Sequence, residues 1–243
     1  MKKVRVLFIH HSTGGLLIAF GNLRKLLKEK APNIEFWDHG YNLYSSKILS
    51  KIFGTLMFRT GLSDGKGKMT GKDFQIFVSN DSPKEYAEIF SRKPTDFTLK
   101  NILDFDVVIF KNCFPTTKIE TKKKLKEYKK YYSQIMKNIS GYKNKFVVFT
   151  PPPLRRETTK PKWAENARNL SDFINSEVKK YKNISVFNFF DFLADKKGKN
   201  KNMLKRNYCN FFIPIDSHPN IRANREVGKI LVDLISFNND RKA

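Results

Sequence analysis

The sequence predicts an α/β protein built as a three-layer doubly wound sandwich, with a mainly parallel five-stranded sheet between two layers of helices. Short apolar runs rich in β-branched and aromatic residues alternate along the chain with amphipathic stretches of helical length. The 243 residues suffice for one large domain, and we find no internal repeat, proline-rich linker or coiled-coil pattern among them. We therefore expect residues 1–243 to fold as a single domain.

Five apolar runs are expected to form the strands. The first follows a basic start at Val4, is too short for the apolar part of a signal peptide and is interrupted by Arg5. We therefore interpret it as a buried strand, and without an export signal the expected compartment is the cytoplasm. The strands are expected at residues 4–9, 34–37, 106–110, 145–150 and 184–188.

Four amphipathic stretches are expected to cover the sheet as helices. The first places Leu16, Phe20, Leu23 and Leu27 on one face, and the others follow the same kind of pattern. The apolar run at residues 189–193 is expected to pack in the core rather than to bind a ligand. The helices are expected at residues 15–28, 119–139, 163–181 and 220–237.

One segment, at about residues 42–94, breaks the alternation of strands and helices. It contains a Gly- and Lys-rich stretch at residues 61–68 and the sequence Asn-Asp-Ser-Pro at residues 80–83, which is typical of a helix start. Long insertions in compact domains often form lids or binding loops. We expect this insertion to lie at the ligand-facing edge of the sheet.

Basic residues dominate the charge of the chain. The 47 Lys and Arg residues outnumber the 23 Asp and Glu residues and give a formal net charge of +24, which attracts anions such as nucleic acid, anionic surfaces or acidic glycans. Most of these cations are lysines scattered along the whole chain, on stretches expected to face water. A weak association with nucleic acid or anionic surfaces is therefore expected, and nucleic-acid binding is not favoured as the main function.

The composition also limits the chemistry. No apolar run approaches the roughly 20 residues that cross a bilayer. The two cysteines, Cys113 and Cys209, are too few for a disulfide framework or a zinc site and are expected to be free thiols. We expect no metal and no organic cofactor.

The first candidate motif is His-His-Ser-Thr-Gly-Gly at residues 10–15, which follows the first strand and opens the first helix. Ligands of open α/β sheets bind at the carboxyl ends of the strands. A helix that begins there offers free backbone N–H groups and the positive end of its dipole. Ser12 is therefore a candidate nucleophile, and its own N–H a candidate donor to an oxyanion. A plain helix-capping role for Ser12 is the alternative.

The second candidate motif, Pro-Ile-Asp-Ser-His-Pro-Asn at residues 214–220, precedes the last helix. Pro219 suits the first position of a helix. His218 would then stand at the helix start, which favours its neutral form and so its action as a base. Asp216 could orient the imidazole, and Ser12 needs such a base to become a nucleophile. Both motifs are expected at the same edge of the sheet.

These motifs resemble those of the SGNH (GDSL-type) hydrolase superfamily, and the order of strands and helices is similar almost from end to end. In that family the nucleophilic Ser closes the first strand, and the Asp and His come from one motif before the final helix. The resemblance implies a flavodoxin-like SGNH hydrolase fold with Ser12, Asp216 and His218 as the catalytic residues. Asp216 stands two residues before His218, where the family has three, so a Ser12–His218 dyad is the alternative.

The resemblance also implies an oxyanion hole. Its donors would be the N–H groups of Ser12 and of Gly40, which follows the second strand, and the side chain of Asn112, which follows the third. Two departures concern these blocks: Ser12 follows His11 instead of Gly-Asp, and the Gly-x-Asn-Asp block of the family is missing around Asn112.

Further residues at the same edge are candidates for contacts with a substrate. We assign this role to His11, Lys111 and Arg155. Arg155 is included because arginine suits anionic groups. Solvated surface charges are the alternative interpretation for Arg155 and its neighbour Arg156.

Two other interpretations of this edge stay open. His11, Asp38 and His39 include the residue types of a metal site, and Cys113 follows a strand as a nucleophile would.

The sequence thus predicts a serine esterase or acyl hydrolase. Its substrate would be a small-molecule or carbohydrate ester, for example an O-acetyl carbohydrate, cleaved through an acyl-enzyme. The alternative is a non-catalytic or acyl-transfer module that holds an anionic ligand, such as an acidic glycan or nucleic acid, in the same crevice.

Overall fold

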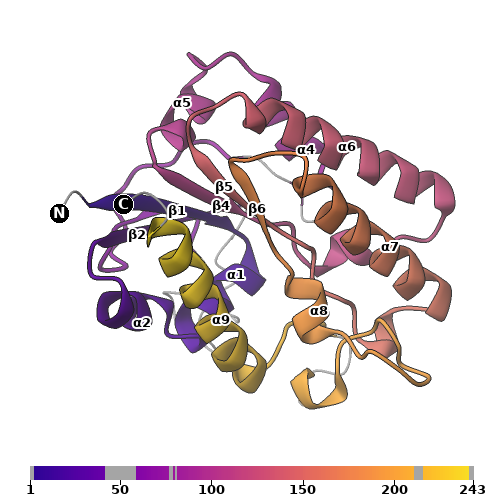
Figure 1. Ribbon diagram of the computed structural model, residues 1–243. Helices are drawn as coiled ribbons and strands as arrows, with labels where there is room; N and C mark the ends of the chain where they lie inside the picture. The colour runs from indigo at the N-terminus through magenta and orange to yellow at the C-terminus, as the bar shows by residue number, and fades with distance from the viewer. Residues whose placement is uncertain (1–2, 42–58, 77–78, 80, 211–215, 241–243) are drawn as a thin grey trace.

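The computed structural model describes residues 3–41, 59–76, 79, 81–210 and 216–240, with side chains up to residue 236. A central sheet separates two layers of helices (Figure 1). The three-layer α/β architecture predicted from the alternation of strands and helices is therefore confirmed. No helix in the described ranges is long and apolar enough to cross a membrane.

Within the described residues the sheet has six strands, in the order β3-β2-β1-β4-β5-β6. All neighbouring strands are parallel except β2 and β3, which are antiparallel. The predicted count of five strands was one too low, because β3 has only three residues and lies in the expected insertion. The strands are β1 (Val4–His10), β2 (Ile34–Gly40), β3 (Gly61–Ser63), β4 (Val107–Phe110), β5 (Lys145–Phe149) and β6 (Ile184–Phe187).

Alternate residues of the central strands face two separate apolar cores. Leu7 and Ile9 of β1 point into a core formed with α4, α5, α6 and α7, whereas Val6 and Phe8 point into a core formed with α1, α2, α8 and α9. The helices are α1 (Ser12–Phe20), α2 (Leu23–Lys30), α4 (Lys84–Ser91), α5 (Phe97–Leu103), α6 (Lys122–Ser140), α7 (Pro161–Val178), α8 (Phe189–Leu193) and α9 (Ile221–Asp240). The part of the chain that the structure describes also contains short 3₁₀ helices at Phe114–Thr117, Arg156–Thr158 and Arg206–Tyr208. The run at residues 189–193 packs in the core as expected.

The first predicted helix is two helices, α1 and α2. The chain breaks at Gly21 and Asn22, where Asn22 adopts a left-handed backbone with φ of 53°. Gly21 contacts α9 closely, because a Cβ at this position would lie 2.9 Å from the carbonyl oxygen of Asn224. The break therefore lets α1 and α9 approach each other on one face of the sheet.

The expected insertion is partly described. Asn-Asp-Ser-Pro at residues 80–83 precedes α4, with Pro83 as its N-cap, so the predicted helix start is confirmed. Residues 42–58 lie outside the described residues, and the expectation of a lid or binding loop concerns them in part. The described remainder contributes β3 to one edge of the sheet and the helix α4 to one layer.

Candidate active site

Ser12 is the first residue of α1 and follows directly on the carboxyl end of β1. His11, the N-cap of α1, is extended, and the turn is tight because a Cβ on Gly14 would meet Cβ of His10 at 2.3 Å. Within the described part of the chain, the backbone N–H groups of Ser12 and Thr13 have no hydrogen-bond acceptor, as is usual in a first helical turn. Both N–H groups stand at the positive end of the α1 dipole.

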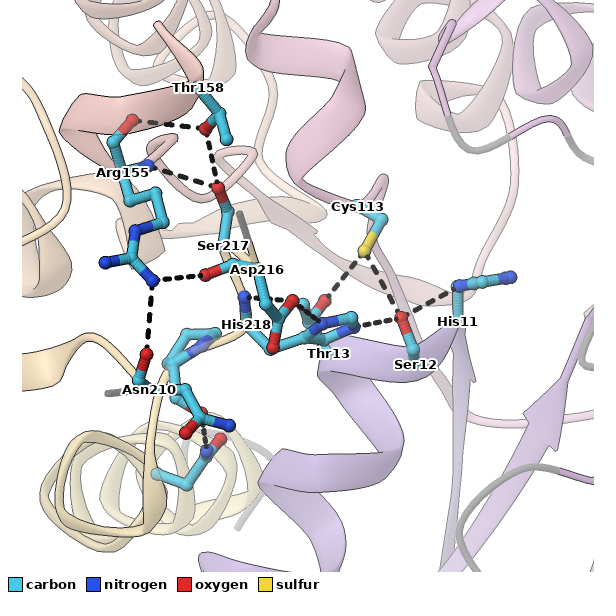
Figure 2. A network of polar contacts seen from close by, with 12 residues as sticks. His11, Ser12, Thr13, Cys113, Arg155, Thr158, Asn210, Asp216, Ser217 and His218 are labelled. Atoms are coloured by element: carbon cyan, nitrogen blue, oxygen red, sulfur yellow. Dashed lines mark hydrogen bonds and ion pairs between the residues drawn. The ribbon is translucent and has the colours of Figure 1, made fainter. Parts of the chain in front are cut away.

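His218 and Asp216 meet Ser12 from the segment before α9 (Figure 2). The hydroxyl oxygen Oγ of Ser12 lies 2.7 Å from Nε2 of His218. The carboxylate of Asp216 contacts Nδ1 of the same ring and accepts a hydrogen bond of 3.1 Å from the backbone N–H of His218. Phe114 packs edge-on against the imidazole, with ring centroids 4.9 Å apart. The structure therefore brings the three predicted catalytic residues together.

The local chain explains how Asp216 reaches the ring. Ile221, and not Pro219 as predicted, is the first residue of α9, and Asn220 caps the helix, because its Oδ1 accepts from the backbone N–H of Ala223 at 3.0 Å. His218 therefore stands two residues before the cap, in non-helical chain, where a carboxylate at residue 216 can bond both its backbone and its ring. The spacing of two residues, which differs from the family pattern, is compatible with a Ser-His-Asp arrangement.

Two further side chains contact the Ser12 hydroxyl. Nδ1 of His11 lies 3.0 Å from Oγ, and Sγ of Cys113 lies 3.6 Å from it. The same sulfur is 3.3 Å from Oγ1 of Thr13. Cys113 follows β4 and is fully buried against the first turn of α1. Sequence reasoning placed His11 and Cys113 at this edge but did not predict their contacts with Ser12.

Lys111 lies beneath this cluster rather than in an open crevice. Its ammonium group donates to Oγ1 of Thr13, and only 1% of the residue is exposed. Burial lowers the pKa of Lys111 to about 8. Burial by itself would raise the pKa of the Cys113 thiol, but Lys111, a hydrogen bond with His11 and the nearby His218 outweigh it and hold that pKa well below its usual value.

Of the two further residues assigned to the oxyanion hole, Gly40 is the last residue of β2 and Asn112 follows β4. Gly40 pairs with His10 of β1 on one side and with Gly61 of β3 on the other, so it lies within the sheet. Nδ2 of Asn112 donates to the carbonyl oxygen of Ser82 at 3.0 Å, and its Oδ1 accepts from the hydroxyl of Tyr132 at 3.0 Å. The Asn112 amide thus connects β4 with the segment before α4 and with α6.

Arg155 is buried and braces the segment that carries Asp216 and His218. Its Nη1 donates to the carbonyl oxygens of Asn210 at 3.1 Å and of Asp216 at 3.4 Å, and its Nε pairs with Glu157 at 2.7 Å. Its backbone N–H donates to Oγ of Ser217 at 3.2 Å (Figure 2). Arg155, which was expected to contact an anionic substrate, thus bonds the protein itself, and no local sequence signal indicates these contacts.

The residues considered for a metal site are not brought together. Asp38 pairs with Arg24 and with Nε2 of His10, the latter at 3.1 Å. His39 is buried, accepts from the backbone N–H of Phe74 at 3.0 Å and lies 3.2 Å from Asp73. Burial lowers the pKa of His39 to about 4. The described ranges contain no group of three His, Cys, Asp or Glu side chains arranged to hold a metal ion.

No model of a protein family matches the sequence, and no curated protein matches it either. Solved structures do match. The chain is similar to a GDSL-like lipase from Bacteroides thetaiotaomicron, with a TM-score of 0.53 and 12% identity over 97% of this chain and 88% of that one. It is also similar to a protein from Bacteroides fragilis described as an acylhydrolase, with a TM-score of 0.54 and 11% identity over 98% and 91% of the two chains. At such low identity the likeness concerns the fold alone: this chain shares the fold of a GDSL-like lipase and of a protein described as an acylhydrolase, as the sequence resemblance predicted.

Proposed function

We propose that the protein is a serine esterase that cleaves O-acyl esters through an acyl-enzyme. The observation that carries this proposal is the contact of 2.7 Å between Oγ of Ser12 and Nε2 of His218, in a ring whose Nδ1 faces the Asp216 carboxylate. A hydroxyl, an imidazole and a carboxylate in this order form the arrangement that activates serine in unrelated hydrolases. The fold shared with a GDSL-like lipase and with a described acylhydrolase supports the same chemistry.

The proposed reaction uses these groups in two half-reactions. Nε2 of His218 takes the proton from Ser12 as Oγ attacks the ester carbonyl, and the carbonyl electron pair moves onto oxygen. The imidazolium, stabilised by Asp216, returns the proton to the leaving alcohol as the C–O bond breaks. Water then attacks the acyl-enzyme by the same route and releases the acid. The backbone N–H of Ser12 is our assigned donor to the oxyanion.

Ser12 is favoured over Cys113 as the nucleophile, although the pKa of the thiol is lowered. Ser12 bonds His218 directly, whereas the Cys113 residue is fully buried and its sulfur contacts the hydroxyls of Ser12 and Thr13. The Ser12 residue is 6% exposed and the Cys113 residue 0%, so the hydroxyl, which also contacts His218, meets a substrate carbonyl more readily than the sulfur does.

The substrate class that we propose is a small O-acyl ester, with O-acetyl carbohydrates as the first candidates. A non-catalytic module that holds an anionic ligand would not need the Ser12 hydroxyl to share a proton with His218. Reaction with a fluorophosphonate probe therefore separates the two functions.

The test compares the wild type with Ser12→Ala on p-nitrophenyl acetate and with the fluorophosphonate probe. We expect the wild type to hydrolyse the ester, and Ser12→Ala to lose activity by about 10³-fold or more. Mass spectrometry should place the probe on Ser12. Full activity in Ser12→Ala, or a probe on Cys113, would show that the nucleophile is assigned wrongly.

A further inference from the structure

A second imidazole faces the Ser12 hydroxyl. In Figure 2, His11 lies on the side of Ser12 away from His218, and the Oγ atom stands between the two rings. Nδ1 of His11 is 3.0 Å from Oγ, and Nε2 of His218 is 2.7 Å from it. Two imidazole nitrogens therefore share one hydroxyl, and the proposed reaction uses only one of them.

The count of hydrogens shows what His11 does in this arrangement. A serine hydroxyl has one proton to donate and lone pairs with which to accept. The Asp216 carboxylate accepts from Nδ1–H of His218, which leaves a lone pair on Nε2 to receive the Ser12 proton. Oγ then offers His11 only a lone pair, so Nδ1 of His11 must carry the hydrogen and donate it.

Local packing holds the His11 ring in this place. His11 is the extended N-cap residue of α1, and its ring lies against the fully buried Tyr41, with ring centroids 5.5 Å apart. Nδ1 is therefore presented to the reacting atom by the same turn that presents Ser12. A donor fixed in advance stabilises a developing charge without reorganising first.

The side chain of Asn112, which the family resemblance assigned to the oxyanion hole, forms hydrogen bonds with other residues. Both the nitrogen and the oxygen of the Asn112 amide are bonded, to Ser82 and to Tyr132. The buried ammonium of Lys111 is held by Thr13. Apart from His218, the side-chain nitrogen that contacts Oγ within the described part of the chain is Nδ1 of His11.

We propose that His11 is a further catalytic residue, and that its Nδ1–H donates to the substrate oxygen that becomes the oxyanion. This inference rests on the proposed esterase function. When Oγ bonds to the acyl carbon, the neighbouring carbonyl oxygen gains the negative charge and becomes the stronger acceptor, so the hydrogen bond passes to it from Oγ. His11 keeps its proton throughout, and the only proton that moves is the one shared by Ser12 and His218.

The test is a matched pair of variants, His11→Leu and His11→Gln, of which only the second keeps a side-chain N–H. Removal of one donor to an oxyanion typically lowers kcat by about 10²–10³-fold. We expect His11→Leu to lose about this much in kcat with KM changed by less than about threefold. His11→Gln should recover part of the loss. Should His11→Leu fail to fold, His11→Ala takes its place.

The affinity for a boronic acid inhibitor is a second measurement, and it would not change if the role of His11 were only structural. Its adduct with Ser12 is tetrahedral and anionic, as the reaction intermediate is. We expect the affinity for the boronic acid to fall in parallel with kcat in His11→Leu, whereas KM for the ester stays almost unchanged.

The outcomes separate this inference from the proposed function. A wild type that neither hydrolyses esters nor reacts with the fluorophosphonate would contradict the esterase itself. An active wild type with Ser12-dependent turnover, combined with His11→Leu that keeps kcat and boronic acid affinity within about threefold, would overturn the role of His11 alone. A loss confined to KM would overturn it as well.

Discussion

At the scale of single residues, Arg155 fixes the position of the proposed catalytic pair. Its guanidinium binds the carbonyl oxygens of Asn210 and Asp216, which lie on either side of residues 211–215. We predict that Arg155→Met lowers kcat for ester hydrolysis by about 10²-fold, because small displacements of a catalytic group have effects of this size. Arg155→Lys should recover part of the lost kcat.

The control for Arg155 is its exposed neighbour Arg156. Arg156→Met removes the same charge at the next position of the chain, where the side chain faces solvent. Its kcat should equal that of the wild type. Equal losses in the two variants would indicate that net charge, and not the brace, determines the effect.

Another residue-scale prediction concerns the buried imidazole of His39. Its pKa is about 4 in the folded protein against 6.5 in an unfolded chain, because burial disfavours the charged form despite Asp73 nearby. Between pH 6.5 and pH 4 the unfolded chain takes up a proton that folded His39 does not, so stability falls as pH falls through this window. The full effect of such a shift is about 3 kcal/mol.

Urea unfolding at pH 7.5 and pH 4.5 checks this prediction. The wild type should lose more free energy of unfolding than His39→Gln, which cannot titrate, between the two pH values. An equal loss in both proteins would show that other groups cause the acid sensitivity.

Sequence reasoning was most successful for residues whose place follows from topology. Ser12 and His218 were predicted to meet because one ends a strand and the other precedes the last helix, and both positions fall at the same edge of a parallel sheet. The directions in which the side chains of Asn112 and Arg155 point could not be predicted from the sequence. They depend on partners such as Ser82 and Asn210, which lie far away in the chain and carry no local signal.

At the scale of elements, the crossing of α1 and α9 supports the site, because α1 begins with Ser12 and α9 follows His218. A Cβ on Gly228 of α9 would lie 2.7 Å from the carbonyl oxygen and 2.8 Å from Cα of Gly21. These are backbone atoms that cannot rotate away. We predict that Gly228→Ala lowers the free energy of unfolding by about 1–3 kcal/mol, and that kcat falls as the helices separate.

A matched control exists at the C-cap of α6. A Cβ on Gly141 would be 3.6 Å from its nearest neighbour, and the φ of this residue is −78°, which any residue adopts. Gly141→Ala should therefore leave the melting temperature unchanged or raise it slightly. Similar melting temperatures for the two alanine variants would contradict the close crossing.

The elements that sequence reasoning missed are the ones that long-range packing determines. The apolar periodicity continues from α1 into α2, so the pattern alone cannot reveal the break at Gly21, where α9 approaches. Strand β3 is three residues long and lies in a Gly- and Lys-rich stretch. Too few residues alternate there to indicate a strand, and pairing with β2 stabilises it.

At the scale of the whole molecule, a net charge of +24 acts on stability as well as on association. Like charges distributed over one compact body repel one another, and salt screens this repulsion. We predict that the melting temperature rises when sodium chloride is added to a low-salt buffer, as differential scanning calorimetry would show. A fall would indicate that attractive surface ion pairs outweigh the repulsion.

The hydroxyl and the imidazole of the proposed site are separated by 206 positions in the chain. A ribosome therefore releases Ser12 well before His218. Until α9 docks against α1, the Ser12 hydroxyl of a nascent chain lacks the His218 imidazole that is proposed to activate it. If the proposed function holds, ester cleavage therefore requires α9 to dock against α1 and reports that this docking has occurred.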